Sequence, residues 1–264
     1  MKKLLKIFTS IITLFTTVIM MTGCFSDYDD YDSYITEETS THDNTSYNDD
    51  VLDYTIMIYM CGSSLEWDQE YHDNNKYIPG YTDEEYQYAA KKDLLEILSL
   101  SIPDNIKIIV ETGGATKWGT SNKYSQPISP THLQIWEVKN KRLNLVAYEN
   151  SNDMGYEGAL YNFVDYGLKK YPAKQTGLIL WDHGAGIGGV CFDDNSRNYL
   201  ANYEIYNAVK DALEAHNKTK LDWIGYDACL MNVADIASVN AEIANYMIAS
   251  QESEAGTGWA YDKW

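Results

Sequence analysis

The sequence predicts an α/β fold in which a mostly parallel sheet is flanked by helices on both faces. Three observations support this prediction. Short apolar runs alternate with longer segments of helical spacing. The runs stop abruptly at turn-forming or polar residues, as buried strands do. The elements follow one another as strand, helix, strand, hairpin, helix, strand, helix, strand, helix and strand, an order that favours parallel pairing with right-handed crossovers.

The individual elements follow from local patterns. The predicted strands are the apolar runs 54–60, 107–111, 177–181, 221–226 and 246–250. The predicted helices cover residues 83–100, 158–170, 202–216 and 233–245. Asp83 is placed to cap the first of these helices, and Pro103 lies beyond its end. Segments 131–138 and 143–148 flank Lys139-Asn-Lys-Arg142 and predict a β-hairpin inserted between the units.

The N-terminal residues have the pattern of an export signal. Three lysines precede an apolar run over residues 7–21, which has the length of a signal-peptide core and is short for a membrane span. The run ends at Met21-Thr-Gly-Cys24, which resembles a bacterial lipoprotein signal. That resemblance implies that residues 1–23 are removed and that Cys24 carries a lipid. An ordinary secretory signal and an uncleaved anchor remain alternatives, and all three place the domain outside the cytoplasm.

The next segment, residues 24–50, differs in composition from the rest. From Phe25 to Asp50 it is rich in Asp, Glu, Ser, Thr and Tyr and contains no Lys or Arg. It cannot bury a core and its charges repel, so we expect an extended, solvated tether. Residues 51–264 are long enough for one α/β domain. Because the chain stops soon after the fifth predicted strand, we expect this domain to be incomplete at its C-terminus.

Charge and cysteine content narrow the function. The formal net charge of −19 argues against nucleic acid as a partner and is compatible with basic substrates. If Cys24 carries a lipid, Cys61, Cys191 and Cys229 remain, so at least one thiol cannot pair within the chain. Catalysis is one explanation for an unpaired thiol in an exported protein. No Cys or His pair has the spacing of a zinc site.

Two predicted strands end in reactive side chains. Leu178-Ile-Leu-Trp-Asp leads into His183-Gly184, and Asp222-Trp-Ile-Gly-Tyr leads into Asp227-Ala-Cys229. In an open parallel sheet, ligands bind outside the carboxyl ends of the strands. If the two strands are neighbours, a base and a nucleophile share one cleft, as a cysteine protease requires.

Six short motifs resemble, in unbroken order, the clostripain family of cysteine endopeptidases, relatives of the caspases, gingipains and legumains. They are Tyr59-Met60, Glu111-Thr-Gly-Gly114, Leu180-Trp-Asp-His183-Gly184, Asp227-Ala-Cys229-Leu-Met231, Ala249-Ser-Gln-Glu252 and Gly258-Trp-Ala-Tyr261. The resemblance covers residues 51–261, and its His-Gly and Asp-Ala-Cys-Leu-Met elements are the specific ones. It implies a caspase-like fold and an endopeptidase that cuts after Arg or Lys through a Cys–His dyad and an acyl-enzyme.

The resemblance also assigns roles to residues. His183 is expected to be the general base and Cys229 the nucleophile, with the backbone N–H groups of Gly184 and Cys229 as the oxyanion site. We also expect Cys229 to begin the following helix, where the helix dipole favours a thiolate. Asp227 resembles the acid of the pocket for Arg or Lys, although it could simply cap a turn. Asp182 is not expected to act with His183, because adjacent residues of an extended chain point to opposite faces.

Members of the family often cut themselves between the two catalytic motifs. Arg197, in the polar loop Asp193-Asp-Asn-Ser-Arg-Asn, is the expected processing site, with Lys218 or Lys220 as the alternative. No cofactor is expected to be required. Some relatives need calcium, and Asp193 with its neighbour Asp194 could supply oxygen ligands, but two adjacent acids do not define a site, and a solvated acidic loop is the preferred explanation.

The leading hypothesis is therefore a lipid-anchored protease on the extracellular face of a bacterial cell membrane, acting on peptides or proteins that contain Arg or Lys. Two alternatives remain. The first is a catalytically inactive, surface-anchored binding module of the same fold, which the missing C-terminal residues would favour. The second is a protease of legumain-like specificity that cuts after Asn or Asp.

Overall fold

The computed structural model describes residues 35–38, 51–68 and 87–263. The chain divides into two units, 1–33 and 34–264, and every described residue belongs to the second unit. The predicted signal peptide and Cys24 therefore lie outside the described residues. Within the described ranges, no helix has the length and apolar character needed to cross a membrane.

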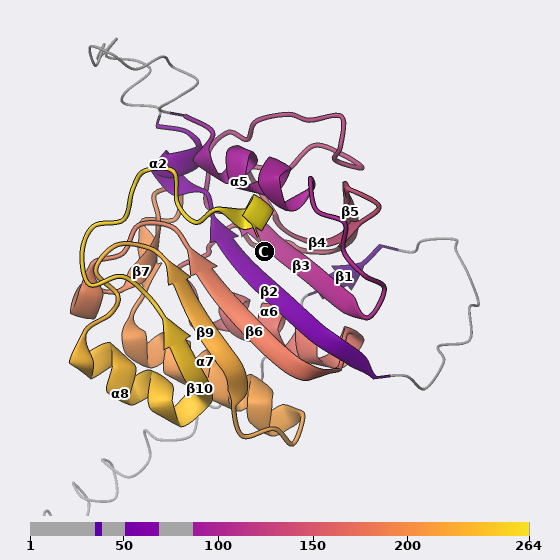
Figure 1. The fold of residues 1–264 in the computed structure, drawn as a ribbon. Helices are drawn as coiled ribbons and strands as arrows, with labels where there is room; N and C mark the ends of the chain where they lie inside the picture. The colour runs from indigo at the N-terminus through magenta and orange to yellow at the C-terminus, as the bar shows by residue number, and fades with distance from the viewer. Residues whose placement is uncertain (1–34, 39–50, 69–86, 264) are drawn as a thin grey trace, which may run out of the picture. The chain divides into compact units, whose positions relative to one another are not determined.

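An eight-stranded sheet forms the centre of the fold (Figure 1). Its strands, in spatial order, are β1 (Ile35–Glu37), β5 (Arg142–Glu149), β4 (Leu133–Lys139), β3 (Ile106–Gly113), β2 (Leu52–Cys61), β6 (Ala173–Trp181), β9 (Leu221–Asp227) and β10 (Ala244–Ile248). The five strands from β3 to β10 in this order run parallel to one another. Strands β4, β5 and β1 extend the sheet in antiparallel fashion. This arrangement confirms the predicted α/β class with its mostly parallel sheet.

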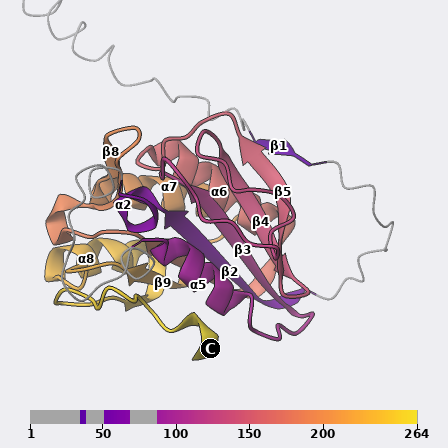
Figure 2. The same cartoon turned by 90° about the horizontal axis from the view of Figure 1, so that it is seen from above.

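Helices lie on both faces of the sheet, as predicted. One face is covered by α5 (Ala89–Ile97), and the opposite face by α6 (Glu157–Lys170), α7 (Asn202–Ala215) and α8 (Ala234–Ile243). Figure 2 shows the sheet between α5 and the pair α6 and α7. Shorter helices are α2 (Ser63–Glu66), η1 (Gly186–Gly188) and η2 (Tyr261–Lys263).

The central strand β2 shows why both faces are covered. Met57, Tyr59 and Cys61 point into the core under α6 and α7, whereas Ile58 and Met60 point into the core under α5. All five side chains are fully buried. Because successive side chains of a strand alternate between faces, a strand that is apolar throughout needs a layer of helices on each side.

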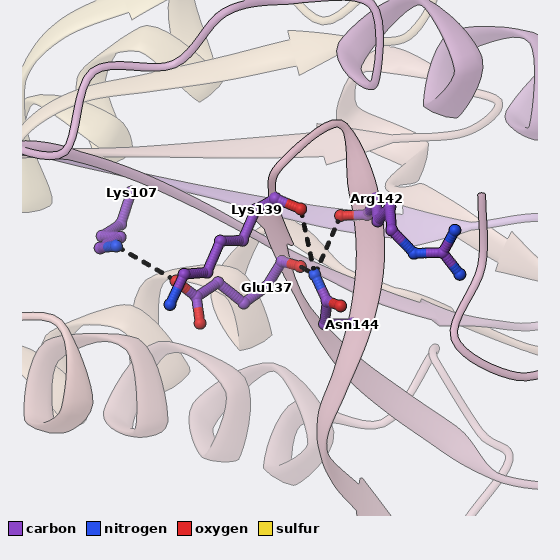
Figure 3. Close-up of polar contacts among 5 residues, drawn as sticks. All are labelled: Lys107, Glu137, Lys139, Arg142 and Asn144. Atoms are coloured by element: carbon purple, nitrogen blue, oxygen red, sulfur yellow. Dashed lines mark hydrogen bonds and ion pairs between the residues drawn. The ribbon is translucent and has the colours of Figure 1, made fainter. Parts of the chain in front are cut away.

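The predicted hairpin is present and joins the main sheet through β3. Its turn is held by Asn144, whose Nδ2 donates to the backbone oxygens of Glu137, Lys139 and Arg142 over 3.2–3.3 Å (Figure 3). On the neighbouring strand, Lys107 Nζ lies 3.2 Å from Glu137 Oε1. The hairpin turn lies at the end of the sheet opposite to the carboxyl ends of the parallel strands, because β4 runs antiparallel to β3 and Glu137, near the end of β4, pairs with Ile109 in the first half of β3.

Three local features differ from the sequence-based expectation. Within the acidic segment 24–50, Ile35–Glu37 form the edge strand β1, where Glu37 makes a 2.6 Å ion pair with Lys170. Helix α5 begins at Ala89, and its first turn is held by the buried Glu66, which accepts the Lys91 N–H over 3.0 Å. The proposed cap Asp83 lies outside the described residues. A small hairpin of β7 (Val190–Asp193) and β8 (Asn198–Leu200) was not predicted.

Two buried glutamates face each other across the hairpin sheet. Glu111 on β3 and Glu149 on β5 are 0% and 2% exposed, and three of their four carboxyl oxygens have no hydrogen-bond partner among the described residues. Burial raises the pKa of Glu149 to about 7, and burial together with Glu149 raises the pKa of Glu111 well above its ordinary range. Because the folded state holds these protons more tightly than the unfolded chain, the stability that they give is present below pH 4.5 and is lost as the pH rises through 7.

We therefore expect Glu149→Gln to raise the free energy of unfolding at pH 8 by on the order of 1–3 kcal/mol while changing it little at pH 4.5. The amide cannot ionise, and its oxygen can still accept the side-chain hydrogen bond that Asn162 makes to Glu149. Denaturant titrations at the two pH values measure the difference. Glu242→Gln, at an exposed glutamate of α8, is the matched control. An equal effect of Glu149→Gln at both pH values would contradict the explanation.

Candidate active site

The register of two neighbouring strands brings His183 and Cys229 to the same edge of the sheet. Strands β6 and β9 are adjacent and parallel, and Trp181 pairs with Asp227 at their carboxyl ends. His183 and Cys229 each lie two residues beyond this pair. The two chains stay together past the strand ends, since the Asp182 N–H donates to the Asp227 carbonyl oxygen over 3.3 Å.

Gly184 lets the segments that follow β6 and β9 touch. A Cβ atom at this position would lie 2.3 Å from the Cys229 carbonyl oxygen and 3.0 Å from the Ala228 Cβ. No side chain fits against a backbone oxygen at that distance, so the His-Gly and Ala-Cys segments can pack only because residue 184 is glycine. The predicted proximity of the two motifs therefore rests on a direct contact.

A cavity of about 350 Å³ opens at this edge, and both His183 and Cys229 line it. Its other lining residues come from α2 and α5, from the ends of β6 and β9, and from the loop after β10. They include Leu65, Ala89, Lys92, Asp93, Glu96, Trp181, Asp227, Glu254 and Gly258. The imidazole, the thiol and several carboxylates thus share one space that can admit a peptide side chain.

The His183 ring contacts a residue that sequence reasoning did not select. Ser64 Oγ, just beyond the carboxyl end of β2, lies 3.3 Å from His183 Nε2. The His183 side chain is exposed to solvent. Partial burial of its ring by the neighbouring residues nevertheless lowers the pKa of the imidazole below its ordinary value. The negative charge of Asp194 opposes this shift only in part. A neutral imidazole can accept a proton from a thiol.

Cys229 is the accessible member of the three free cysteines in the described residues, since Cys61 and Cys191 are fully buried. Its Sγ accepts the backbone N–H of Glu254 over 3.3 Å. Cys229 does not begin the following helix as expected: α8 starts at Ala234, with Val233 as its N-cap. The residues between adopt extended and left-handed conformations, including Leu230 at φ 65°, so the helix dipole does not end at the sulfur.

The backbone donors expected for an oxyanion are unoccupied. Among the described residues, the N–H groups of Gly184 and Cys229 have no backbone or side-chain acceptor, whereas the next N–H, that of Leu230, donates to Glu252 over 3.1 Å. Two free N–H groups beside a thiol are the donors that a developing oxyanion needs.

Asp227 lines the cavity and is 5% exposed. Its Oδ2 accepts the Tyr261 phenol over 2.9 Å and the Trp259 N–H over 3.2 Å. Burial raises the pKa of Asp227 to about 7, and the neighbouring Glu254 adds to the rise. Asp227 therefore lines the pocket and also holds the C-terminal segment in place.

Asp182 lies on the opposite face from His183. It is 3% exposed, and burial raises its pKa well above the ordinary range, opposed only in part by the His183 N–H and the Cys61 thiol. Cys61 and Cys191 lie in the core on the α6 and α7 side. Asp182 also borders the cavity, but alternation along the chain directs its side chain towards that core and the His183 side chain away from it.

Arg197 lies at the exposed turn between β7 and β8, with a left-handed backbone at φ 58°. The turn is held at its base by Asp193, whose carboxylate accepts the N–H groups of Met154, Asn195 and Ser196 over 2.8–3.1 Å. Asp153 accepts the Ser196 hydroxyl over 2.8 Å from the other side. These carboxylates are therefore already engaged with protein donors.

The alternative cleavage residues lie elsewhere. Lys218 and Lys220 are in the turn between α7 and β9, at the end of the sheet opposite to the cavity, where their ammonium groups bind the carbonyl oxygens of Ala173 and Ala241. In the described part of the chain, no three His, Cys, Asp or Glu side chains are grouped so as to hold a metal ion.

Sequence reasoning missed Ser64, Asp93 and Glu254. Asp93 carried a detectable signal: it lies three residues after Ala90 and four before Ile97, on the apolar face of α5, where a carboxylate is rare unless it has a partner. Ser64 follows the carboxyl end of β2 and so shares the edge where ligands bind in parallel sheets. Glu254 belongs to a loop whose path no local pattern predicts.

Comparisons with known proteins show which proteins this chain resembles. Clostripain from Hathewaya histolytica is 29% identical over 127 residues, which are 42% of this chain and 24% of that protein. A secreted C11 cysteine protease from Bacteroides thetaiotaomicron, iotapain, superimposes with a TM-score of 0.55 at 14% identity, over 81% of this chain and 56% of its own. Its complex with an irreversible peptide inhibitor gives 0.56 at 15% identity, over 80% and 52% of the two chains.

An inactive zymogen C11 protease from Parabacteroides distasonis gives a TM-score of 0.52 at 19% identity, covering 81% of this chain and 52% of that one. At these identities the structural likeness shows the shared fold alone. This chain spans about a quarter of clostripain and about half of the structures that it resembles. The clostripain family model matches residues 77–264, well over half of the sequence, and the chain therefore belongs to the clostripain family of C11 peptidases.

Proposed function

We propose that this protein is a cysteine endopeptidase that cuts peptide chains after Arg or Lys, with Cys229 as nucleophile and His183 as general base. The observation that carries the proposal is the cavity that both side chains line at the carboxyl ends of adjacent strands. Membership of the clostripain family supports the same reaction class. The thiol is exposed enough to meet a substrate, unlike the buried Cys61 and Cys191.

The reaction follows from the groups in the cavity. The neutral imidazole of His183 takes the proton of the Cys229 thiol, and the thiolate attacks the carbonyl carbon of the scissile bond. The N–H groups of Gly184 and Cys229 stabilise the oxyanion. His183 then gives the proton to the leaving amine, and water, activated by the same imidazole, hydrolyses the acyl-enzyme. Ser64 holds Nε2 of the ring, which leaves Nδ1 for the proton transfers.

Asp227 supports the preference for a basic side chain. It lies near the thiol in sequence and lines the same cavity, with Oδ2 held by Tyr261 and Trp259. A buried carboxylate stabilises a guanidinium or ammonium group far better than a neutral side chain, because few waters compete.

We also propose that the mature protein is exported and lipid-anchored at Cys24 on the outer face of a bacterial membrane, and that it needs no cofactor. The signal-like residues 1–23 support export, and the structural relatives from Bacteroides thetaiotaomicron are secreted proteases. Chelation with EGTA tests whether activity needs calcium. Asp193 already accepts three backbone N–H groups, which argues against a calcium site there.

Alkylation will identify the nucleophile. We expect iodoacetamide to modify Cys229 ahead of Cys61 and Cys191, and Cys229→Ala to lower peptidase activity by at least about a thousandfold. Peptide mapping by mass spectrometry locates the label, and fluorogenic peptides measure activity. Cys191→Ala is the control for loss of a thiol alone. A wild-type protein that binds peptides but neither reacts at Cys229 nor cleaves them would instead be the binding module of the same fold.

Removing the charge of Asp227 tests its proposed role in binding a basic side chain. Asp227→Asn keeps an oxygen for Tyr261 and Trp259 but loses the charge, so kcat/KM for substrates with Arg or Lys before the cut should fall about tenfold to hundredfold. The rate of Cys229 alkylation should change little. Asp235→Asn, at an exposed aspartate of α8, is the matched control. Wild-type preference for Asn or Asp in that position would contradict the assignment of the pocket.

Self-processing is expected after Arg197, because this residue is exposed at a hairpin turn. Wild-type protein should yield two fragments on a denaturing gel, whereas Cys229→Ala and Arg197→Gln should each remain a single chain. N-terminal sequencing of the smaller fragment should begin at Asn198. The double variant Lys218→Gln, Lys220→Gln controls for the alternative site. If this double variant remained a single chain while Arg197→Gln was still cleaved, the processing site would be at Lys218 or Lys220 instead.

A further inference from the structure

A run of exposed apolar side chains begins at the residue after Cys229. Leu230, Ile187 and Tyr203 are 39%, 75% and 65% exposed. None of the three lines the cavity that holds the His183 ring and the Cys229 thiol. Single exposed apolar residues are common on proteins, but a contiguous group of them marks a surface that binds a ligand or a partner.

Backbone contacts join these residues into one surface. A Cβ atom built on Gly186 would lie 3.3 Å from the Leu230 carbonyl oxygen, so the turn that carries Ile187 packs against the residue after the nucleophile. The Asn202 side chain donates to the Gly186 carbonyl oxygen over 3.3 Å, which places the beginning of α7, and with it Tyr203, beside the same turn. The apolar side chains therefore follow one another from the nucleophile to α7.

The run ends in an open groove between α7 and α8, with a volume of about 660 Å³. Ile187, Tyr203, Tyr206 and Val239 form its apolar wall, and Glu242 is the charged side chain that lines it. An aliphatic or aromatic side chain placed in this groove leaves water for an apolar surrounding, whereas an acidic side chain meets a like charge. The α7–α8 groove therefore favours an apolar ligand.

The Leu230 side chain is held at the surface by its backbone. Its φ of 65° lies in the left-handed region, which leucine rarely adopts. Its N–H donates to the Glu252 carbonyl oxygen over 3.1 Å, and the next side chain, Met231, is fully buried. These two anchors keep Leu230 exposed next to the thiol. Unusual backbone conformations of this kind concentrate at sites that bind ligands.

We propose, on the basis of the peptidase function above, that Leu230 and the α7–α8 groove bind the part of the substrate that follows the scissile bond and favour a large aliphatic or aromatic side chain there. The residue before the cut enters the cavity lined by Asp227, so the chain after the cut leaves that cavity across Cys229. Leu230 is the first exposed apolar side chain on this path, and the groove lies beyond it. The occupant is a substrate chain because the run of apolar residues starts at the nucleophile.

Quenched fluorescent peptides with Arg before the cut test the inference. Each of the four positions after the cut carries Phe, Ser or Glu in turn, with Gly at the others. In at least one position, we expect Phe to raise kcat/KM about fivefold to tenfold over Ser and Glu to lower it. The gain should appear mainly in KM, because the groove holds a part of the substrate that does not react.

Ile187→Ser removes an exposed side chain from the groove and should abolish the gain from Phe. Its kcat/KM should stay within about twofold of wild type for the Ser peptides and for an arginyl amide of aminomethylcoumarin, which has no residue after the cut. Tyr246→Ser is the matched control, because Tyr246 is 74% exposed and pairs with Trp223 on the α5 face of the sheet.

The contrary results separate this inference from the catalytic proposal. Wild-type protein that cleaves the arginyl amide but treats all the peptides alike would overturn the inference and leave the peptidase function intact. An effect of Ile187→Ser on elution from a size-exclusion column, with no change in any kinetic constant, would overturn it also and assign the groove to a contact between copies of this chain.

Fluorescence anisotropy of the same peptides on full-length Cys229→Ala decides the question if wild-type protein cleaves no substrate. Tighter binding of the Phe peptide than of the Ser peptide, lost in the double variant with Ile187→Ser, would uphold the groove and refute the peptidase function. Equal affinities, or no binding, would overturn the inference.

Discussion

The site depends on one constraint, the parallel register of β6 and β9. Because Trp181 lies opposite Asp227, the two strands end level with each other, and the residues two positions further on come to the same edge. A shift of one residue would turn each side chain to the other face of the sheet. His183 would then enter the core that now holds Asp182. The glycine contact between residues 184 and 229 fixes the same register beyond the last strand hydrogen bonds.

The sequence predicted most of this architecture because the buried strands carry strong signals. Strands β2, β6 and β9 are apolar on both faces, and each ends at a turn. The positions of these strands in the sequence, and the proximity of His183 and Cys229, could therefore be predicted. The beginning of α5 could not, since a distant glutamate, Glu66, holds its first turn. Strand β1 was missed because it depends on backbone pairing with β5 and on an ion pair with Lys170, not on its own composition.

For a similar reason, only some residues of the site could be predicted from the sequence. His183, Gly184, Asp227 and Cys229 belong to strand ends, whose relative positions follow from the sheet. Asp93 and Glu254 reach the cavity from a helix and a loop, and only tertiary packing brings them there. Cys229 was expected at a helix N-terminus, but four residues separate it from α8. The short linking segment has its own backbone geometry, with Leu230 in the left-handed region, which hydrophobic periodicity does not reveal.

Buried carboxyl groups on both faces of the sheet make the fold sensitive to alkalinity. On one side, Glu111 and Glu149 favour the fold while they hold their protons. On the other, burial raises the pKa of Asp93 to about 8 and that of Asp227 to about 7, so their ionisation disfavours the fold as well. Under the proposed function, a basic side chain bound beside Asp227 offsets part of that loss, so the protein should be most resistant to unfolding when its cleft is in use.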